Sequence, residues 1–446
     1  MINLFERFDL NARTLYDTLR LSKQATTTLV IEDDGFLPED IVTPYRFFAD
    51  MEIAPHAKPL YFNEVPIPRF WEIEGNNEVA WVKDMGMTRA KINYRQDQKP
   101  RVVSHVDWYD AHGRLQFVDH YTEQGVHFAQ SVYDLEGTLI LRKYLDQQGK
   151  EVIYENFVVR SIILNWKGKT YHFQHKVSFI LFFIKALNLT DHRFIINSLG
   201  LPYAVLYNLE TPGHDLLFWQ EQSGGNVPGN MQLMLQGKST RQFDVVVPDA
   251  NEYQALTASM TEPERQHVHQ AGYLYDYQKK NGYTMNILIM TNSDQIHHLP
   301  SIIEACPFAT FHIGAVTEMS SNLTVLDQYS NVKLFPAIEI ETVNKLYQLC
   351  DVYLDINEGG EIINAVRRAF YHQLLILAYE EIAHNRTVTA PENCFTKADG
   401  AQALKEALKD IQQKKRFFKV RETYQQQHVN QTDIKTFNAL MSQLTV

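Results

Sequence analysis

A twelve-residue repeat limits the fold of this chain more than any other feature of its sequence. Glycines recur twelve residues apart, and a tyrosine or leucine begins each of the segments 109–113, 121–125, 133–137 and 145–149. An aspartate, or once a threonine, follows that first residue. Glycine supplies the positive φ of a tight turn, and aspartate bonds its own turn backbone. A strand and a glycine-ended turn every twelve residues predict an antiparallel β-meander, which we place at residues 61–175.

Sequence of a different kind flanks this repeat. Residues 1–60 and 176–280 carry helical periodicity and short β-branched runs, so we interpret them as two parts of one Rossmann-like layer that the meander interrupts. Residues 281–420 alternate short apolar strands with helical patterns, which predicts a second, parallel doubly wound domain. Residues 421–446 form a C-terminal tail, and one prediction is that this tail crosses back to the first layer.

The fold class that follows is α/β, with two facing Rossmann-like domains of the GT-B type and an inserted antiparallel β-meander domain. Parallel sheets bind ligands at the carboxyl ends of their strands, so we expect a ligand cleft there. Two such layers without a GxGxxG segment favour sugar-nucleotide transferases over dehydrogenases.

Composition excludes several classes of protein. A chain of 446 residues with 45% hydrophobic residues can bury a core. Its net charge of −11 argues against a nucleic-acid-binding protein, which needs a basic surface. The three cysteines form no CxxC pair, which favours a reducing cytoplasm. The N-terminus has no apolar h-region, so we expect no signal peptide. The apolar run 177–187 is too short to span a bilayer and predicts a buried helix.

The second domain lacks the groups that a nucleotide-sugar donor requires. No Lys or Arg occurs from residue 281 to 332, and Asp294 follows the first strand, where it would repel a diphosphate. Residues 355–366, DINEGGEIINAV, resemble a relic of the E-G-F-G-x-x-x-x-E motif of retaining glycosyltransferases. Glu358 and Gly359 match its E-G, but Glu361 replaces a glycine and Val366 replaces the ribose-binding glutamate. Alternatively, the two glutamates simply favour a helix start; both interpretations exclude donor binding.

A closer resemblance covers nearly the whole chain. Residues 31–48, 216–232 and 355–366 resemble the glycosyltransferase-stabilising subunit of the accessory Sec system. The resemblance implies a non-catalytic subunit that needs no cofactor and partners a catalytic O-GlcNAc transferase. It also implies that the subunit binds the serine-rich repeat adhesin polypeptide which that enzyme modifies. The implied location is cytoplasmic, in solution or peripheral on the cytoplasmic face of the cell membrane.

Two sets of candidate residues follow. For the acceptor we predict cleft-lining side chains, with Trp219 as an aromatic platform unless it belongs to the core; the candidates are His214, Trp219, Asn230, Asn292, Asn357 and Glu358. For the partner interface we predict half-wet aromatic side chains of the meander, which are otherwise core residues; these are Trp108, Tyr109, Tyr121 and Tyr133.

Other signals are weaker. Glu32, Asp33 and Asp34 follow a strand as a metal-binding DxD might, but loop acids are commoner there, and the paired histidines lack ligand partners, so we predict no metal. Two alternative functions remain open. One is an active retaining sugar-nucleotide-dependent protein O-glycosyltransferase. The other is a glycan or peptide binder without an enzyme partner.

Overall fold

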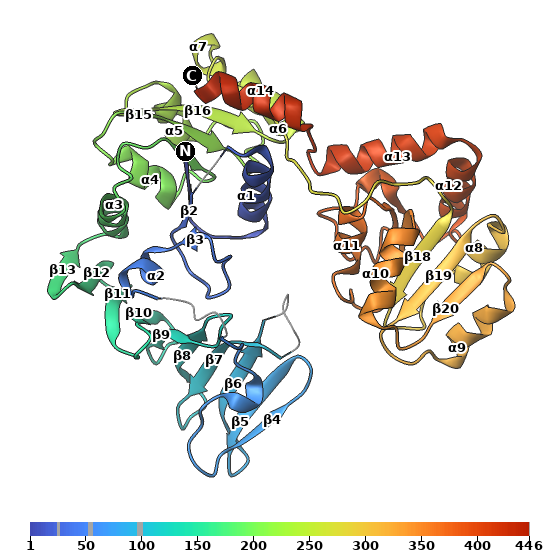
Figure 1. The fold of residues 1–446 in the computed structure, drawn as a ribbon, viewed down its shortest axis with the longest axis horizontal. Helices are drawn as coiled ribbons and strands as arrows, with labels where there is room; N and C mark the ends of the chain where they lie inside the picture. The colour runs from blue at the N-terminus through green and yellow to red at the C-terminus, as the bar shows by residue number, and fades with distance from the viewer. Residues whose placement is uncertain (25–26, 52–56, 96–100, 446) are drawn as a thin grey trace. The chain divides into compact units, whose positions relative to one another are not determined.

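The computed structural model of this chain describes residues 1–24, 27–51, 57–95 and 101–445 (Figure 1). The chain forms two compact units. Unit 1 consists of Met1–Ala271 and the C-terminal residues from Leu444, and unit 2 consists of Gly272–Gln443. Each unit has its own hydrophobic core of buried aliphatic and aromatic side chains.

A parallel sheet of seven strands forms the centre of unit 1 within the described residues. Its strand order is β17 (Val268–Gln270), β16 (Arg241–Val247), β15 (Gly213–Phe218), β14 (Phe194–Ile196), β1 (Ile2–Phe5), β2 (Thr27–Val30) and β3 (Ile41–Val42). Because β1 to β3 precede the meander and β14 to β17 follow it, the meander is an insertion in this layer, which confirms the predicted fold class.

Helices cover this sheet. The helical segments of unit 1, some of which pack on the meander instead, are α1 (Leu10–Ser22), α2 (Pro44–Phe48), η1 (Phe62–Glu64), α3 (Lys176–Ala186), α4 (Leu201–Tyr207), α5 (Gly229–Leu235), α6 (Ala250–Ala258) and α7 (Glu262–Arg265). The apolar run of α3 buries Phe179 and Phe183 in the core, so the predicted buried helix is confirmed. In the part of the chain that the structure describes, no helix is long and apolar enough to cross a membrane.

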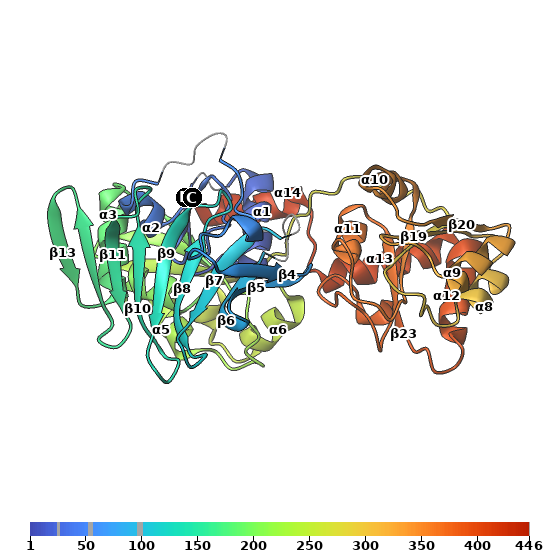
Figure 2. The same ribbon diagram turned by 90° about the horizontal axis from the view of Figure 1, so that it is seen from below.

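The meander is an antiparallel sheet of ten strands, counted over the described residues, in simple sequence order (Figure 2). The strands are β4 (Glu72–Gly75), β5 (Val79–Asp84), β6 (Met87–Tyr94), β7 (Val103–Tyr109), β8 (Leu115–Tyr121), β9 (His127–Tyr133), β10 (Leu139–Leu145), β11 (Glu151–Asn156), β12 (Ser161–Trp166) and β13 (Lys169–Phe173). The repeat forms the turns as predicted. Asp134 Oδ1 accepts hydrogen bonds from the backbone of Glu136 and Thr138 at 3.0 and 2.8 Å, and Gly137 has a φ of 81°.

One face of the meander packs against the helices of unit 1. A row of directly opposed residues crosses six strands on this face: His105, His120, Ala129, Tyr144, Ile153 and Leu164. The last four residues of this row belong to the unit 1 core, where Tyr144 stacks on Tyr45 of α2 with ring centroids 3.8 Å apart. The inserted sheet and the first layer therefore share a core.

Unit 2 is built on a parallel sheet with six strands among the described residues. Its order is β20 (Val332–Phe335), β19 (Thr310–Ala315), β18 (Asn286–Thr291), β21 (Val352–Asp355), β22 (Leu375–Tyr379) and β23 (Cys394–Phe395). Its helical segments are α8 (Leu299–Ala305), α9 (Ser321–Thr324), η2 (Val325–Gln328), α10 (Ile340–Leu349), α11 (Ala365–Tyr371), η3 (Pro391–Asn393), α12 (Gln402–Gln413) and α13 (Lys415–His428). This confirms the predicted second doubly wound domain.

The chain ends in helix α14 (Ile434–Thr445). Leu444, in its last turn, belongs to unit 1. There the Arg193 guanidinium donates a hydrogen bond to the Leu444 carbonyl oxygen at 2.6 Å. This contact supports a return of the tail to the first layer.

Candidate functional site

The carboxyl edge of the unit 2 sheet is where a nucleotide-sugar donor would bind, and the chain's own side chains fill it. Strand β21 ends at Asp355, and the loop that follows carries Glu358 into contact with Lys397 Nζ and with His297 Nε2, the latter at 2.6 Å. The hydrogen bond from Lys397 lowers the pKa of Glu358. Lys397 and His297 thus already have a carboxylate partner in the chain.

A second ion pair lies beside the first. His384 donates its backbone N–H to Asp355 Oδ2 at 2.8 Å, and its Nδ1 lies 2.5 Å from Asp355 Oδ1. The other ring nitrogen of His384 contacts the carbonyl oxygen of Gly359. The hydrogen bond to Asp355 raises the pKa of His384 to about 9, so this histidine is protonated at neutral pH. It fastens the 355–359 loop to the end of β21.

The remaining residues of the degenerate motif have structural roles. Val366 is fully buried in the first turn of α11, and its backbone N–H donates to Glu361 Oε1 at 3.0 Å. The N–H that would face a phosphate at this helix start is therefore occupied by a carboxylate of the same loop.

The structure brings three of the predicted acceptor residues together at this edge. Asn357 forms a β-bridge with Ile296, and the Glu358 backbone N–H donates to the Gln295 carbonyl at 2.9 Å. Asn292 Oδ1 packs so tightly over Gly359 that a Cβ at Gly359 would lie 1.9 Å from it. Asn357 is only 2% exposed, whereas Asn292 and Glu358 reach the surface.

The predicted acceptor residues of unit 1 do not form a site. Trp219 is 4% exposed in the core and donates its indole N–H to Glu252 Oε1 at 3.0 Å, so the core alternative is right and the stacking platform is wrong. His214 lies at the start of β15, where its Nε2 is 2.6 Å from Asp244 Oδ2. It is thus at the amino edge of the sheet, opposite the edge that binds ligands, because all strands are parallel. Asn230 is exposed near the start of α5.

The four predicted interface residues also lie in different environments. Trp108 is half-buried and lies directly opposite Phe117, which opposes Val132, which opposes Leu141. This row, here called the aromatic row, lies on the meander face opposite the His105 row. Tyr109 and Tyr133 are half-buried at the ends of β7 and β9. Tyr121 is only 6% exposed inside the core under β5 to β8, so its prediction as an interface residue is wrong.

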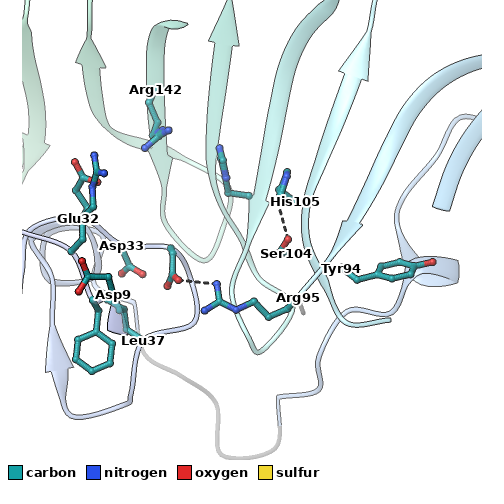
Figure 3. Close-up of a pocket in the computed structure, with 13 residues that line it drawn as sticks. Asp9, Glu32, Asp33, Leu37, Tyr94, Arg95, Ser104, His105 and Arg142 are labelled. Atoms are coloured by element: carbon teal, nitrogen blue, oxygen red, sulfur yellow. Dashed lines mark hydrogen bonds and ion pairs between the residues drawn. The ribbon is translucent and has the colours of Figure 1, made fainter. Parts of the chain in front are cut away.

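Unit 1 contains a cavity that sequence reasoning missed (Figure 3). It has a volume of about 720 Å³ and lies between the loops after β1 and β2 and the strands β6, β7, β8 and β10 of the meander. The lining residues are Arg7, Phe8, Asp9, Glu32, Asp33, Asp34, Leu37, Tyr94, Arg95, Ser104, His105, His120 and Arg142. A sequence signal did exist, because histidines interrupt the apolar alternation of β7 and β8, but the repeat alone does not show which loops face them.

The acids after β2 are ion-paired rather than arranged for a metal. Their partners come from distant parts of the chain: Glu32 pairs with Arg7 at 2.8 Å, Asp33 with Arg46 at 2.7 Å, and Asp34 with Arg95 at 2.8 Å. Among the described residues, no group of three or more His, Cys, Asp or Glu side chains is arranged to hold a metal ion.

Comparison with known proteins places this chain among glycosyltransferase-like folds. The pneumococcal O-GlcNAc transferase GtfA, in complex with UDP and GlcNAc, has a TM-score of 0.54 at 13% identity, with 100% of this chain and 99% of that chain covered, which shows the fold alone. A chain in the crystal structure of a GtfA/B complex bound to UDP and GlcNAc has a TM-score of 0.90 at 35% identity, with 100% of both chains covered.

Sequence comparison is more specific. Family models match the GtfB N-terminal domain over residues 2–48, the GtfB middle domain over 71–174, the GtfB third domain over 176–259 and the GftB/GlyA-F C-terminal domain over 287–427. The UDP-N-acetylglucosamine–peptide N-acetylglucosaminyltransferase stabilizing protein GtfB of Streptococcus agalactiae is 39% identical over 396 residues, 89% of each chain. The chain belongs to the GtfB family of stabilizing proteins, which confirms the resemblance noted from its sequence.

Proposed function

We propose that this protein is the non-catalytic subunit that stabilises a catalytic N-acetylglucosaminyltransferase. The observation that carries the proposal is the filled donor edge of unit 2, where Glu358, Lys397, Asp355 and His384 pair with one another. A diphosphate would have to compete with Glu358 for Lys397 and with Asp355 for His384. The stabilizing-protein names of the relatives, and the solved GtfA/B complex, support the same function.

Co-expression with a GtfA-type transferase tests this proposal directly. The two chains should co-elute on size-exclusion chromatography, and the transferase should melt at a higher temperature in the complex, because a partner that binds only the folded state stabilises it by mass action. The isolated protein should show no calorimetric binding of UDP-N-acetylglucosamine at millimolar ligand. A micromolar dissociation constant would favour the alternative, an active retaining O-glycosyltransferase.

The aromatic row of the meander is the proposed transferase contact. Trp108, Phe117, Val132 and Leu141 lie side by side on four neighbouring strands and are half-buried. Such a face is stabilised when a partner covers it. Val132→Asp should abolish co-elution, because an unpaired carboxylate would be buried in the interface. The matched control is Leu135→Asp, since Leu135 is 68% exposed in the turn that follows β9. If the two variants had equal effects on co-elution, the aromatic row would not be the transferase interface.

The acceptor is the second part of the proposal. We propose that the protein binds the serine-rich repeat adhesin polypeptide in the cytoplasm, before accessory Sec export, with the surface side chains Asn292 and Glu358 in contact with it. Three free cysteines support a reducing compartment, in solution or at the cytoplasmic face of the membrane. Glu358→Gln should weaken binding of a serine-rich peptide to the complex. Glu341→Gln, at an exposed helix start in the same unit, is the matched control.

A further inference from the structure

The cavity of unit 1 lies between the parallel sheet of the first layer and the inserted meander. Its floor is the carboxyl edge of a parallel sheet, the position at which such sheets bind ligands. Its roof is the inner face of the meander (Figure 3). Because floor and roof belong to the same compact unit, the cavity depends on no other domain for its shape.

The roof is polar where it covers the cavity, and beyond the cavity the same two rows enter the hydrophobic core, apart from buried Glu155, which pairs with Lys176. Along the His105 row, His105 and His120 line the cavity, whereas Tyr144, Ile153 and Leu164 continue the same row into the hydrophobic core. The neighbouring row behaves alike, since Arg142 lines the cavity and Ile162, two strands further along, is in the core. Polar side chains on an inner sheet face are unfavourable unless something polar meets them.

The roof side chains are held in fixed orientations. Ser104 Oγ donates to the Asn93 carbonyl at 3.1 Å and lies 2.8 Å from His105 Nδ1, so Nδ1 carries the proton and Nε2 of His105 presents its lone pair. His105 is 39% exposed at its side chain, and Nε2 is 3.8 Å from Asp107 Oδ1, beyond hydrogen-bond distance.

His120 is fixed in the same way. Ser131 Oγ accepts from Arg142 Nε at 2.8 Å and lies 2.9 Å from His120 Nε2. Burial lowers the pKa of His120 to about 3 and also lowers the pKa of His105. Both imidazoles are therefore neutral at physiological pH, and each has one ring nitrogen engaged by a serine hydroxyl.

The charges of the cavity disfavour an anionic ligand. Four carboxylates and three guanidinium groups line it. Arg7 and Arg95 are paired with Glu32 and Asp34, and Arg142 is engaged by Ser131. A phosphate would therefore meet an excess of negative charge. A neutral ligand rich in hydroxyl groups matches the donors and acceptors that remain, and the volume of the cavity falls in the range of ligand pockets, about 300–1,000 Å³.

We propose that this cavity binds a hydroxyl-rich, neutral segment of the acceptor polypeptide, with His105 Nε2 accepting a hydrogen bond from a ligand hydroxyl. The inference rests on the proposed acceptor function and adds a contact beneath the meander to the one proposed at Asn292 and Glu358. The hydroxyl can come from a serine side chain or from an N-acetylglucosamine already attached to one.

The test uses the full-length protein in complex with its transferase. Binding of a fluorescent serine-rich peptide, bare or carrying N-acetylglucosamine, is measured by anisotropy for the wild type, His105→Ala and Ser104→Ala. We expect at least fivefold weaker binding for His105→Ala and a smaller loss for Ser104→Ala, which removes the group that orients the imidazole. His112→Ala, exposed in the turn after the same strand, is the matched control and should bind as the wild type does.

The outcomes separate this inference from the proposed function. A loss with both peptides, or with the glycosylated peptide alone, supports the cavity and identifies which hydroxyl it binds. Wild-type affinity in both variants, with the transferase complex intact, overturns the cavity while leaving the proposed function standing. Competition by inorganic phosphate at low millimolar concentration overturns the neutral ligand. If the wild-type protein itself forms no complex with the transferase, the proposed function fails instead. Far-UV circular dichroism confirms that each variant is folded.

Discussion

The two parallel sheets share one strand topology, but their carboxyl edges differ: side chains of the protein occupy the edge in unit 2, and a cavity lies at the edge in unit 1. In unit 2, Asp355, His384, Glu358 and Lys397 pair with one another and fill the edge. In unit 1, the acids after β2 pair with Arg7, Arg46 and Arg95 around an open cavity of about 720 Å³. Internal ion pairs thus occupy the edge in unit 2, whereas a ligand-sized space remains at the equivalent edge in unit 1.

Breaking the filled edge should have the largest effect. Asp355 is fully buried and bonds both nitrogens of His384 that face it. Asp355→Ala leaves the backbone N–H and the ring Nδ1–H of His384 without their acceptor and removes the buried ion pair, and we expect unfolding to become easier by about 3 kcal/mol. Urea denaturation of the full-length protein measures this loss. Asp327→Ala, an exposed acid of the same unit, should change little; equal losses would mean that the pair does not hold the edge.

A pH series examines the same pair without disturbing the packing. The pKa of His384 is about 9 in the folded protein and 6.5 in a model peptide. Because the folded pKa is raised, the stabilisation is complete below pH about 6.5 and is lost as the pH rises through about 9, by at most about 3 kcal/mol. Urea midpoints between pH 6 and 9.5 should fall in the wild type and fall less in His384→Gln. Parallel curves would contradict this assignment.

A substitution at the cavity of unit 1 should destabilise the fold less than one at the paired edge of unit 2. Ser104 bonds Asn93 and His105 at the roof of the cavity. Ser104→Ala should cost about 1 kcal/mol, because water in the cavity can satisfy the groups left behind. Thermal unfolding followed by circular dichroism gives the value. A loss as large as that of Asp355→Ala would show that the two edges are equally tight.

The smallest effect is expected at the solvent-facing pair of unit 2. Lys397→Ala removes the lysine partner of Glu358 and leaves His297 in contact with it, and the Lys397 and Glu358 side chains are each about one-quarter exposed. We expect no measurable change in melting temperature, since exposed ion pairs contribute little. Calorimetry should also show no gain of UDP-N-acetylglucosamine binding, because Asp355 and His384 still fill the edge. Binding after this single change would mean that Lys397 alone closes the site.

Local patterns in the sequence predicted local structure well. The turn at Gly137 and its Asp134 hydrogen bonds follow from residues that are neighbours along the chain. The apolar run of α3 and the strand–helix alternation of unit 2 also act over short distances. Trp219 shows the limit of this reasoning, because whether an aromatic side chain stacks on a ligand or fills a core depends on Glu252 and on packing partners that the local sequence does not reveal.

The sequence by itself determined the repeat, its turns and the two α/β layers, and it predicted that Glu361 and Val366 replace donor-binding residues. Only the tertiary structure decided which charges meet. Arg95 reaches Asp34 across 61 positions, and His384 reaches Asp355 across 29. Likewise, the β-strand period of two places His105 on one face of its strand, but only the docking of that face over the β1 and β2 loops makes a cavity of it. Side-chain periodicity is set by the backbone, whereas pairing across the fold is set by packing and charge between segments distant in sequence.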